Sequence, residues 1–267
     1  MDKWAITTSK ARGKHGYGLT ARALQLSREL QIPVLERQNR SIPRLLEQYG
    51  LDCLLVEEEK ELAAHWPDGM HLAFHPGMAV QRIRQIKDHK VEMLTHVTGV
   101  RPGDTILDCT MGLAGDAIVL AYAAGDTGKV TALESSPLIY AITSYGLTRW
   151  DTGSWRMHQA MRRIESHCCD YRDYLQQMAE GAYDIVYLDP MFERPVLRSS
   201  GIAPLRREAN HAPLTEEMLQ LASRAARRRV VVKHRAGTLQ HLQFNQVQGG
   251  TYSALAYGLI MTDRKGV

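Results

Sequence analysis

The sequence predicts an α/β fold built on a mostly parallel sheet, with a small α/β domain before it and an antiparallel hairpin at its end. From residue 105 onward, short apolar runs alternate with stretches of helical periodicity. Two of these runs, 105–108 and 183–189, end at an aspartate, where a strand would hand over to its loop. Gly249-Gly250 separates the last two apolar segments, which favours a tight antiparallel connection.

The small domain is predicted over residues 1–75 and the main domain over 76–267, because His75-Pro76-Gly77 is typical of a break between elements. Ser41 is positioned to cap the second helix of the small domain, and Pro43 suits its first turn. The elements expected in the small domain are strands at 4–8, 32–35 and 53–57, helices at 19–31 and 42–49, and a hairpin over 62–74.

The main domain is expected to begin with a basic helical connector over residues 78–97. The final segments, 243–248 and 252–261, are expected to pair antiparallel to each other rather than to form another βαβ unit. Between the connector and the final segments, the expected strands are 105–107, 129–133, 165–169, 185–188 and 230–233. The expected helices there are 115–124, 137–147, 155–165, 171–179 and 214–227.

The composition is that of a soluble globular protein, with 44% hydrophobic and 23% charged residues. No apolar run approaches the roughly 18–20 residues of a membrane span, and the first residues lack a signal-peptide core, so a cytoplasmic location is expected. The four cysteines have no C-x-x-C spacing, and no metal site is expected. A net charge of +4 permits a polyanionic partner without requiring one.

Arginines gather in two clusters. The first lies in a predicted long loop over residues 193–213 and favours contact with RNA phosphates, although a solvated loop is the alternative; it comprises Arg194, Arg198, Arg206 and Arg207. The second is expected at a helix C-terminus, where the helix dipole favours cations; it comprises Arg224, Arg227, Arg228 and Arg229. Lys233, at the end of a predicted strand, is a further candidate for substrate contact, and His234 is a lesser candidate, as a general base.

The first aspartate-ended strand leads into a loop that suits a cofactor. Thr110, Gly112 and Gly115 depart from the G-x-G-x-x-G fingerprint of dinucleotide sites, but small residues still let the backbone approach a ligand. Asp108 and Asp116 flank this loop and suit a ligand that carries a sulfonium and an ammonium group better than one with a pyrophosphate. The alternative is a plain strand-to-helix turn capped by Asp116.

Two later carboxylates belong to the same predicted site. Glu134 ends the next strand, 22 residues after Gly112, and could accept hydrogen bonds from both ribose hydroxyls of a nucleoside cofactor. Asp170 follows another predicted strand, next to Cys169, and could receive an adenine amine. An equally good local interpretation makes Asp170 the N-cap of the helix that begins at Tyr171.

The second aspartate-ended strand leads into Asp189-Pro190-Met191-Phe192, which indicates a catalytic loop for a planar amine. An aromatic amine is a poor nucleophile because its lone pair is delocalised into the ring. Asp189 and the Pro190 carbonyl could accept the two amine hydrogens and turn the lone pair out of the ring, while Phe192 stacks on the base.

These motifs resemble the small-subunit ribosomal RNA guanine-N2 methyltransferases of bacteria, from about His75 to Lys233. The resemblance rests on Leu188-Asp189-Pro190-Met191-Phe192, on Val230–Lys233 and on the cofactor loop. It implies a class I methyltransferase fold with a Rossmann-like sheet. The cofactor contacts that it implies are Gly115, Asp116, Glu134, Ser135, Asp170 and Asp189.

The chain departs from the family pattern at two of these positions: Gly115 and Ser135 each stand where the family has arginine. It is more similar to an uncharacterised branch of the family found in Gram-positive bacteria. The predicted reaction is methyl transfer from S-adenosylmethionine to an exocyclic amine, most directly guanine N2 in ribosomal RNA. The alternatives are the same chemistry on DNA or on a protein, and a non-catalytic nucleic-acid-binding module.

Overall fold

The computed structural model describes residues 3–9, 16–58, 60–151, 153–191, 203–250 and 254–262. The chain divides into two compact units. The first contains the described residues within 1–75, 137–150 and 201–208, and the second contains the remainder. The expected division of the chain into 1–75 and 76–267 stays a prediction. Residues 137–150 and 201–208, which that division assigns to the main domain, group with the first unit.

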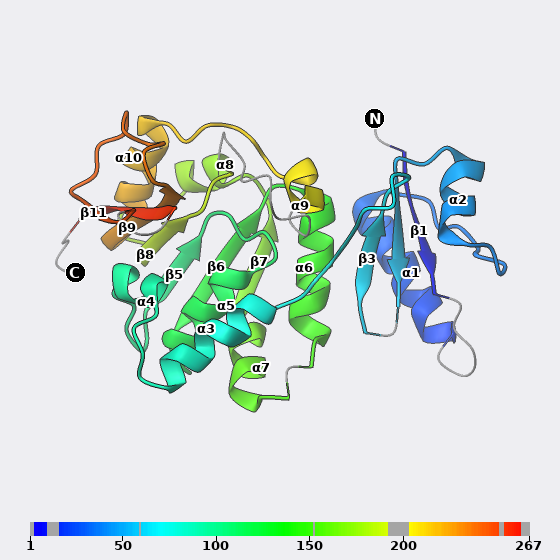
Figure 1. Ribbon diagram of the computed structural model, residues 1–267, viewed down its shortest axis with the longest axis horizontal. Coiled ribbons are helices and arrows are strands. Elements are labelled where there is room, and N and C mark those ends of the chain that lie inside the picture. Colours follow the sequence, from blue (N-terminus) through cyan, green and yellow to red (C-terminus); the bar gives the residue numbers. More distant parts are fainter. Residues whose placement is uncertain are drawn as a thin grey trace. The chain divides into compact units, whose positions relative to one another are not determined.

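The first unit is built on a four-stranded sheet in the order β1-β2-β3-β4 (Figure 1). β1 (Trp4–Thr8) runs parallel to β2 (Cys53–Glu57), and β3 (Leu62–His65) pairs antiparallel with both β2 and β4 (His71–Ala73). The predicted hairpin over 62–74 is confirmed. The segment predicted as a strand at 32–35 forms only a single bridge, between Ile6 and Val34.

Helices of the first unit come from three parts of the chain. Ser41 caps α2 as predicted, because its Oγ accepts a hydrogen bond from the Arg44 N–H at 3.4 Å. α6 packs on β3, and α9 contacts both β4 and α6. Gly146 of α6 lies against the Phe74 ring, so closely that a Cβ there would be 2.1 Å from Cγ of Phe74. The helices of this unit are α1 (Gly16–Leu30), α2 (Ile42–Tyr49), α6 (Pro137–Arg149) and α9 (Ala203–Glu208).

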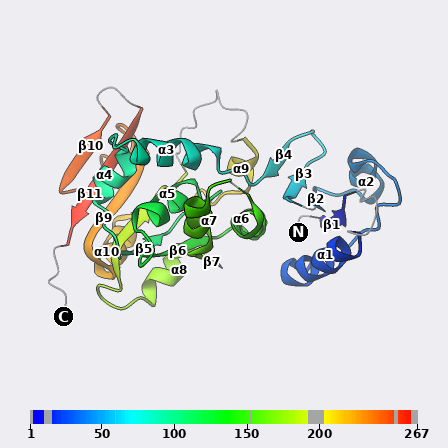
Figure 2. The same ribbon diagram turned by 90° about the horizontal axis from the view of Figure 1, so that it is seen from below.

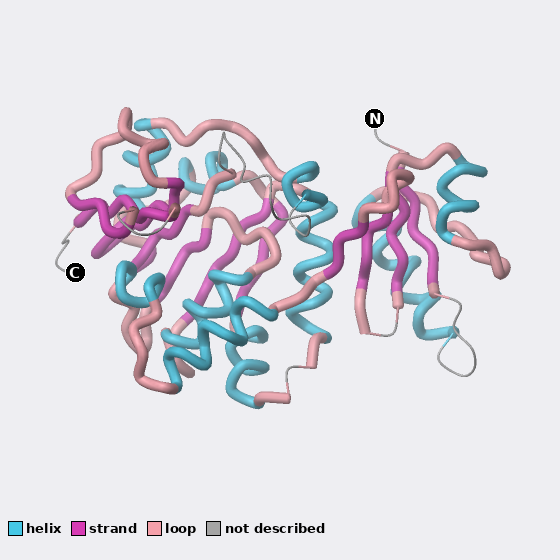
Figure 3. The backbone as a smooth tube through the Cα atoms, viewed as in Figure 1, coloured by secondary structure: helices cyan, strands magenta, loops and turns pink. Residues whose placement is uncertain are grey.

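The second unit contains a seven-stranded sheet, whose strands are magenta in Figure 3. The strand order is β10-β11-β9-β8-β5-β6-β7. Five of its strands are parallel, and β11 pairs antiparallel with β9 and with β10, so the predicted terminal antiparallel pair is confirmed. The strands are β5 (Thr105–Asp108), β6 (Lys129–Glu134), β7 (Ile164–Cys168), β8 (Tyr183–Leu188), β9 (Ala226–Arg235), β10 (Gln246–Gly249) and β11 (Leu255–Met261).

Helices cover both faces of this sheet (Figure 2). α5 packs on β6 and β7 and contacts α3, α4 and α7, while α10 packs on β8 and β9 and contacts α8. The helices are α3 (Gly77–Lys87), α4 (Met93–Thr98), α5 (Gly115–Ala123), α7 (Trp155–Arg162), α8 (Tyr171–Gln176) and α10 (Glu216–Ala225). Within the described ranges, no helix combines the length and the apolar character needed to cross a membrane.

Two local predictions about the second unit are wrong. The connector predicted as one helix over 78–97 is two helices, because His89 adopts a φ of 54° and Glu92 caps α4 by accepting from the Thr95 N–H at 2.9 Å. The arginines at 227–229 do not end a helix but lie on β9. Arg227 there binds Asp184 at 2.7 Å, and Arg229 donates to the Val97 carbonyl in the last turn of α4 at 2.9 Å. These side chains therefore contact neighbouring elements rather than the end of a helix of their own.

Candidate active site

The loop after β5 is held between the ends of two neighbouring strands. The Met111 N–H donates to the Leu133 carbonyl of β6 at 2.8 Å, and the Cys109 N–H donates to the Tyr187 carbonyl of β8 at 2.9 Å. Gly112 has a φ of 51°, which glycine adopts without steric cost. The loop therefore turns sharply at the carboxyl edge of the sheet, where ligands of such folds bind.

Glu134 shapes this loop from the end of β6. Its carboxylate accepts the Gly112 N–H at 3.0 Å and the Ser136 N–H at 2.8 Å, and the Cys169 N–H donates to its backbone carbonyl at 3.0 Å. Burial raises the pKa of Glu134, although the hydrogen bonds from backbone N–H groups oppose that shift. A carboxylate has about four lone-pair positions, so ribose hydroxyls could still bind Glu134, and this contact stays a prediction.

Thr110 joins the two aspartate-ended strands. Its N–H donates to Asp108 at 3.0 Å, and its Oγ1 accepts the backbone N–H of Asp189 at 2.7 Å. The side chain of Asp108 is buried at the end of β5, and burial raises its pKa to about 8. The predicted cofactor loop and the predicted catalytic loop are thus one hydrogen-bonded structure.

A network of charged side chains lies beneath this edge. Lys233 Nζ donates to Asp189 at 2.7 Å and to Asp116 at 3.1 Å. Asp116 also binds Arg82 and accepts the Tyr187 hydroxyl at 2.6 Å. Arg82 also binds Glu92 at 2.8 Å, so two cations and three carboxylates form a largely buried cluster in which each charge has an opposite partner.

The two carboxylates of this network differ in their pKa values. Burial opposes the ionisation of Asp116, but the charges of Lys233 and Arg82 outweigh burial and hold its pKa below the usual range. Burial raises the pKa of Asp189 to about 6, and Lys233 limits that rise. Asp116 is therefore the permanently ionised anchor of Lys233, while Asp189 can titrate near neutral pH.

The structure corrects one interpretation of Asp116. The alternative that Asp116 caps α5 is wrong, because Ala114 occupies the N-cap position, with a φ of 58°. Asp116 instead accepts from three donors of the protein, which makes it a structural charge of the site. A cofactor contact by Asp116 stays a prediction, as it does for Gly115 at the start of α5 and for Ser135 after β6.

Asp170 has the capping role that its sequence also permits. Its side chain accepts from the Arg172 N–H at 2.9 Å at the start of α8, pairs with the Arg172 guanidinium, and binds Asn210 at 3.0 Å. The hydrogen bonds from Arg172 lower its pKa. The adenine contact predicted for Asp170 and its neighbour Cys169 stays a prediction.

The predicted substrate residues lie in different places. Phe192, Arg194 and Arg198 lie outside the described residues. Arg206 and Arg207 were expected in a loop but lie on α9 in the first unit, where Arg207 binds Asp68 at 3.2 Å and lies over the Trp66 ring. The substrate contact predicted for Lys233 also stays a prediction, while its Nζ binds Asp116 and Asp189.

Two site residues were missed by sequence reasoning. Tyr187 precedes Asp189 by two residues, and the two-residue period of a strand places both on one face. The sequence could therefore have predicted that Tyr187 lies in the site. Arg82 reaches Asp116 from α3, 34 residues away, and no local pattern signals that contact.

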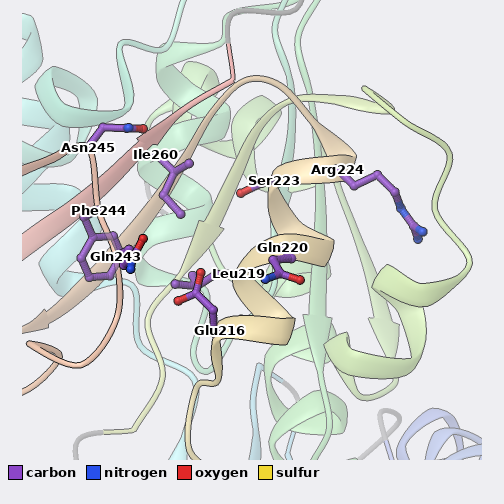
Figure 4. Close-up of a pocket in the computed structure, with 9 residues that line it drawn as sticks. All are labelled: Glu216, Leu219, Gln220, Ser223, Arg224, Gln243, Phe244, Asn245 and Ile260. Atoms are coloured by element: carbon purple, nitrogen blue, oxygen red, sulfur yellow. The ribbon is translucent and has the colours of Figure 1, made fainter.

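A separate groove lies along α10, away from the predicted site residues (Figure 4). Glu216 and Gln220 of α10 face Gln243 and Phe244, and the Arg224 side chain points away from them. The groove is lined by Glu216, Leu219, Gln220, Ser223, Arg224, Gln243, Phe244, Asn245 and Ile260. It contains none of the residues at the carboxyl edge and is not the candidate active site.

The chemistry of the carboxyl edge fits S-adenosylmethionine. Glu134 offers acceptors for hydroxyl groups, and Asp189 offers a carboxylate for a sulfonium or an ammonium group. Asp108, whose pKa burial raises to about 8, offers a carboxyl group that can accept a hydrogen bond. The two cations of the edge, Lys233 and Arg82, are engaged by carboxylates and do not form a phosphate site.

Comparison with known proteins agrees with this chemistry. A family model described as "Putative SAM-dependent methyltransferase", where SAM is S-adenosylmethionine, matches residues 47–249. The chain is 35% identical over 259 residues to "Uncharacterized protein YpiP" of Bacillus subtilis strain 168, covering 96% of this chain and 99% of that protein. It is 33% identical over 201 residues to ribosomal RNA small subunit methyltransferase J of Cellvibrio japonicus, covering 68% of this chain and 73% of that protein.

A solved structure has a similar fold. The crystal structure of the SAM-dependent methyltransferase NGO1261 from Neisseria gonorrhoeae superposes with a TM-score of 0.62 at 20% identity, covering 97% of this chain and 96% of that one. The predicted class I methyltransferase fold and the predicted cofactor are confirmed. The match of the family model over residues 47–249 shows that the chain belongs to the S-adenosylmethionine-dependent methyltransferases.

Proposed function

We propose that this enzyme methylates an exocyclic amino group of RNA, namely N2 of a guanine in small-subunit ribosomal RNA. One observation above all supports an amine as the group that receives the methyl. Lys233 binds Oδ2 of Asp189, and within the described residues nothing donates to Oδ1. The Asp189 side chain is 26% exposed, so Oδ1 offers a fixed, charged acceptor at the end of β8.

The chain's own residues would activate the amine. Asp189 Oδ1 accepts one amine hydrogen and the Pro190 carbonyl accepts the other, so the nitrogen lone pair turns out of the base ring. When bound, S-adenosylmethionine would supply an electrophilic methyl group: the amine nitrogen would bond to its carbon as the carbon–sulfur bond breaks, and sulfur would keep that electron pair. Asp189, with its pKa raised to about 6, can take the proton that the methylated nitrogen releases.

The cofactor would be held by the residues around the loop after β5. Glu134 could accept hydrogen bonds from hydroxyl groups, and the buried carboxyl group of Asp108 could accept one from an ammonium group. Thr110 keeps the two loops in one arrangement, because it binds the Asp189 backbone N–H. This fixed geometry reduces the reorganisation needed when the substrate arrives.

The choice of RNA is supported by relatives. The similar proteins of Cellvibrio japonicus and Coxiella burnetii are named ribosomal RNA small subunit methyltransferase J. The chain's net charge of +4 suits a polyanionic substrate.

The test measures transfer of a labelled methyl group. Purified protein and labelled S-adenosylmethionine are incubated with 30S subunits from a strain that lacks the gene, and nucleosides are then analysed by mass spectrometry. We expect label in N2-methylguanosine that is sensitive to RNase. Label that is sensitive to DNase or to protease instead would assign the enzyme to DNA or protein, and no label would contradict the activity.

The role of Asp189 is tested in the same assay at saturating cofactor. Asp189→Ala should lower turnover by orders of magnitude, because it removes an acceptor needed most in the transition state. Asp189→Asn should also fail, because a carboxamide offers only one acceptor oxygen. Asp173→Asn, an exposed aspartate on α8, is the matched control and should retain full activity. Near-normal turnover by Asp189→Ala would refute the assignment.

A further inference from the structure

A small pocket lies beside the catalytic loop, at the carboxyl ends of β8 and β9. Pro190 and Met191 form one side of it, and His234, the residue after Lys233 on β9, forms another. Leu214 and Leu239 supply apolar walls. An extruded base needs a site of this character, with apolar walls and a few polar groups that read its edge.

Among the described residues, the buried Nε2 of His234 has no hydrogen-bond partner. Its residue is 5% exposed, its Nδ1 lies 2.9 Å from the Arg235 carbonyl, and its ring is parallel to that of Phe244 at 6.0 Å. Because a carbonyl only accepts, Nδ1 carries the hydrogen, and in the neutral ring Nε2 carries a lone pair.

An unpartnered buried acceptor is uncommon in a folded protein and calls for an explanation. His234 and Lys233 are consecutive on a strand, so they point to opposite faces of the sheet. Lys233 points toward Asp116 and Asp189, and His234 therefore lies on the opposite face of the sheet. The His234 side chain is thus separated from the charged network and lines the pocket.

We propose that this pocket holds the target base and that His234 Nε2 accepts a hydrogen bond from the ring N–H next to the exocyclic amine. This inference rests on the proposed function and deepens it. Three RNA bases carry an exocyclic amine, but only in guanine is the adjacent ring nitrogen, N1, a donor. In adenine and cytosine that ring nitrogen carries a lone pair, which would face the lone pair of Nε2. The acceptor at His234 therefore selects guanine.

The contact is tested with two synthetic RNAs that cover the methylated site found by nucleoside mapping. One carries guanine at the target position and the other 2-aminopurine, which has the same N2 amine but no hydrogen on N1. Wild-type enzyme should prefer guanine, in kcat/KM, by roughly tenfold to a hundredfold, the effect of a buried acceptor left unpaired. A wild-type preference within about twofold would overturn the inference.

Variants of His234 assign the preference to this residue. His234→Phe keeps an aromatic ring against Phe244 but removes Nε2, so its preference for guanine should fall to within about threefold. His234→Gln, whose side chain has an acceptor oxygen, should retain part of the preference. The cycle of variant and analogue isolates this one contact, because the other effects of each change cancel.

Controls separate the outcomes. Titration calorimetry with S-adenosylhomocysteine should give each variant the affinity of the wild type, which shows that the cofactor site is folded. If wild-type enzyme methylates guanine but His234→Phe keeps the full preference, the pocket assignment is wrong and the proposed function stands. If wild-type enzyme labels neither RNA, the proposed function fails, and the pocket assignment fails with it.

Discussion

Replacing Lys233 by methionine should move the pH dependence of the enzyme upward. The methionine side chain has a similar length but no charge, so Asp189 loses the cation that lies 2.7 Å from its Oδ2. Asp116 keeps Arg82 as a partner and stays ionised. Its negative charge then acts on Asp189 without the intervening ammonium group, and this raises the pKa of Asp189 further.

The size of the shift follows from the geometry. An opposite charge within hydrogen-bond distance lowers the pKa of a carboxyl group by about 1–3 units. Asp189 is 26% exposed and its charge is partly solvated, so we expect the lower part of that range. Removing the Lys233 cation should therefore raise the pKa of Asp189 by about 1–2 units, which corresponds to about 1.4–2.7 kcal/mol less stabilisation of the carboxylate. From a pKa of about 6, Asp189 should titrate at about 7 to 8 in the variant.

The assay is the pH profile of kcat/KM for RNA at saturating S-adenosylmethionine, which reports groups of the enzyme before RNA binds. Asp189 must be ionised to accept an amine hydrogen and then the released proton, so activity falls as pH falls through its pKa. Lys233→Arg, which keeps a cation, should leave the acid limb near its original position. Lys129→Met, at an exposed lysine at the start of β6, should change nothing.

One result would refute this reasoning. If Lys233→Met raises KM for RNA and shrinks its salt dependence, but leaves the acid limb where it was, Lys233 contacts the substrate and does not position Asp189. That outcome would support the interpretation of Lys233 drawn from the sequence alone.

Three further predictions concern binding and stability. Glu134→Ala should weaken the binding of S-adenosylhomocysteine by roughly 1–3 kcal/mol in titration calorimetry, because the Gly112 N–H loses its acceptor and the hydroxyls lose theirs; unchanged affinity would contradict this. The pKa of Asp108 rises from 3.8 to about 8 on folding, so the folded state holds a proton that the unfolded state releases, and stability falls as pH rises between these values, by at most about 1.4 kcal/mol per unit. Asp108→Asn should therefore gain stability relative to wild type from pH 5 to pH 8 in urea unfolding, and a constant difference would count against the buried acid. Gly146→Ala should lower the free energy of unfolding by about 1–3 kcal/mol, because its Cβ would lie 2.1 Å from the Phe74 ring, whereas Gly115→Ala, with open space around the added methyl, should stay within about 1 kcal/mol of wild type in the same measurement.

The elements and the family were predictable from local sequence. Apolar runs and their periodicity reflect the burial of one face of a helix or strand, and this pattern is visible over a few consecutive residues. The loop motif at Asp189 and the spacing from Gly112 to Glu134 follow from the same parallel-strand logic, because the carboxyl ends of such strands lie at one edge. Tyr187 was within reach of this logic, since it shares a face with Asp189.

Only the tertiary structure decided which charges meet. Lys233 lies 44 residues from Asp189, and 117 from Asp116, and Arg82 reaches Asp116 from a different helix. From the sequence alone, Lys233 is a basic residue at the end of a strand and is predicted to contact a polyanionic substrate. The folded chain instead places the cation between two partly buried carboxylates, because removing such charges from water without a partner costs several kcal/mol. For the same reason Arg227 lies on β9 against Asp184. The local sequence shows that a charge is present, but only the packing of distant segments determines which opposite charge it contacts.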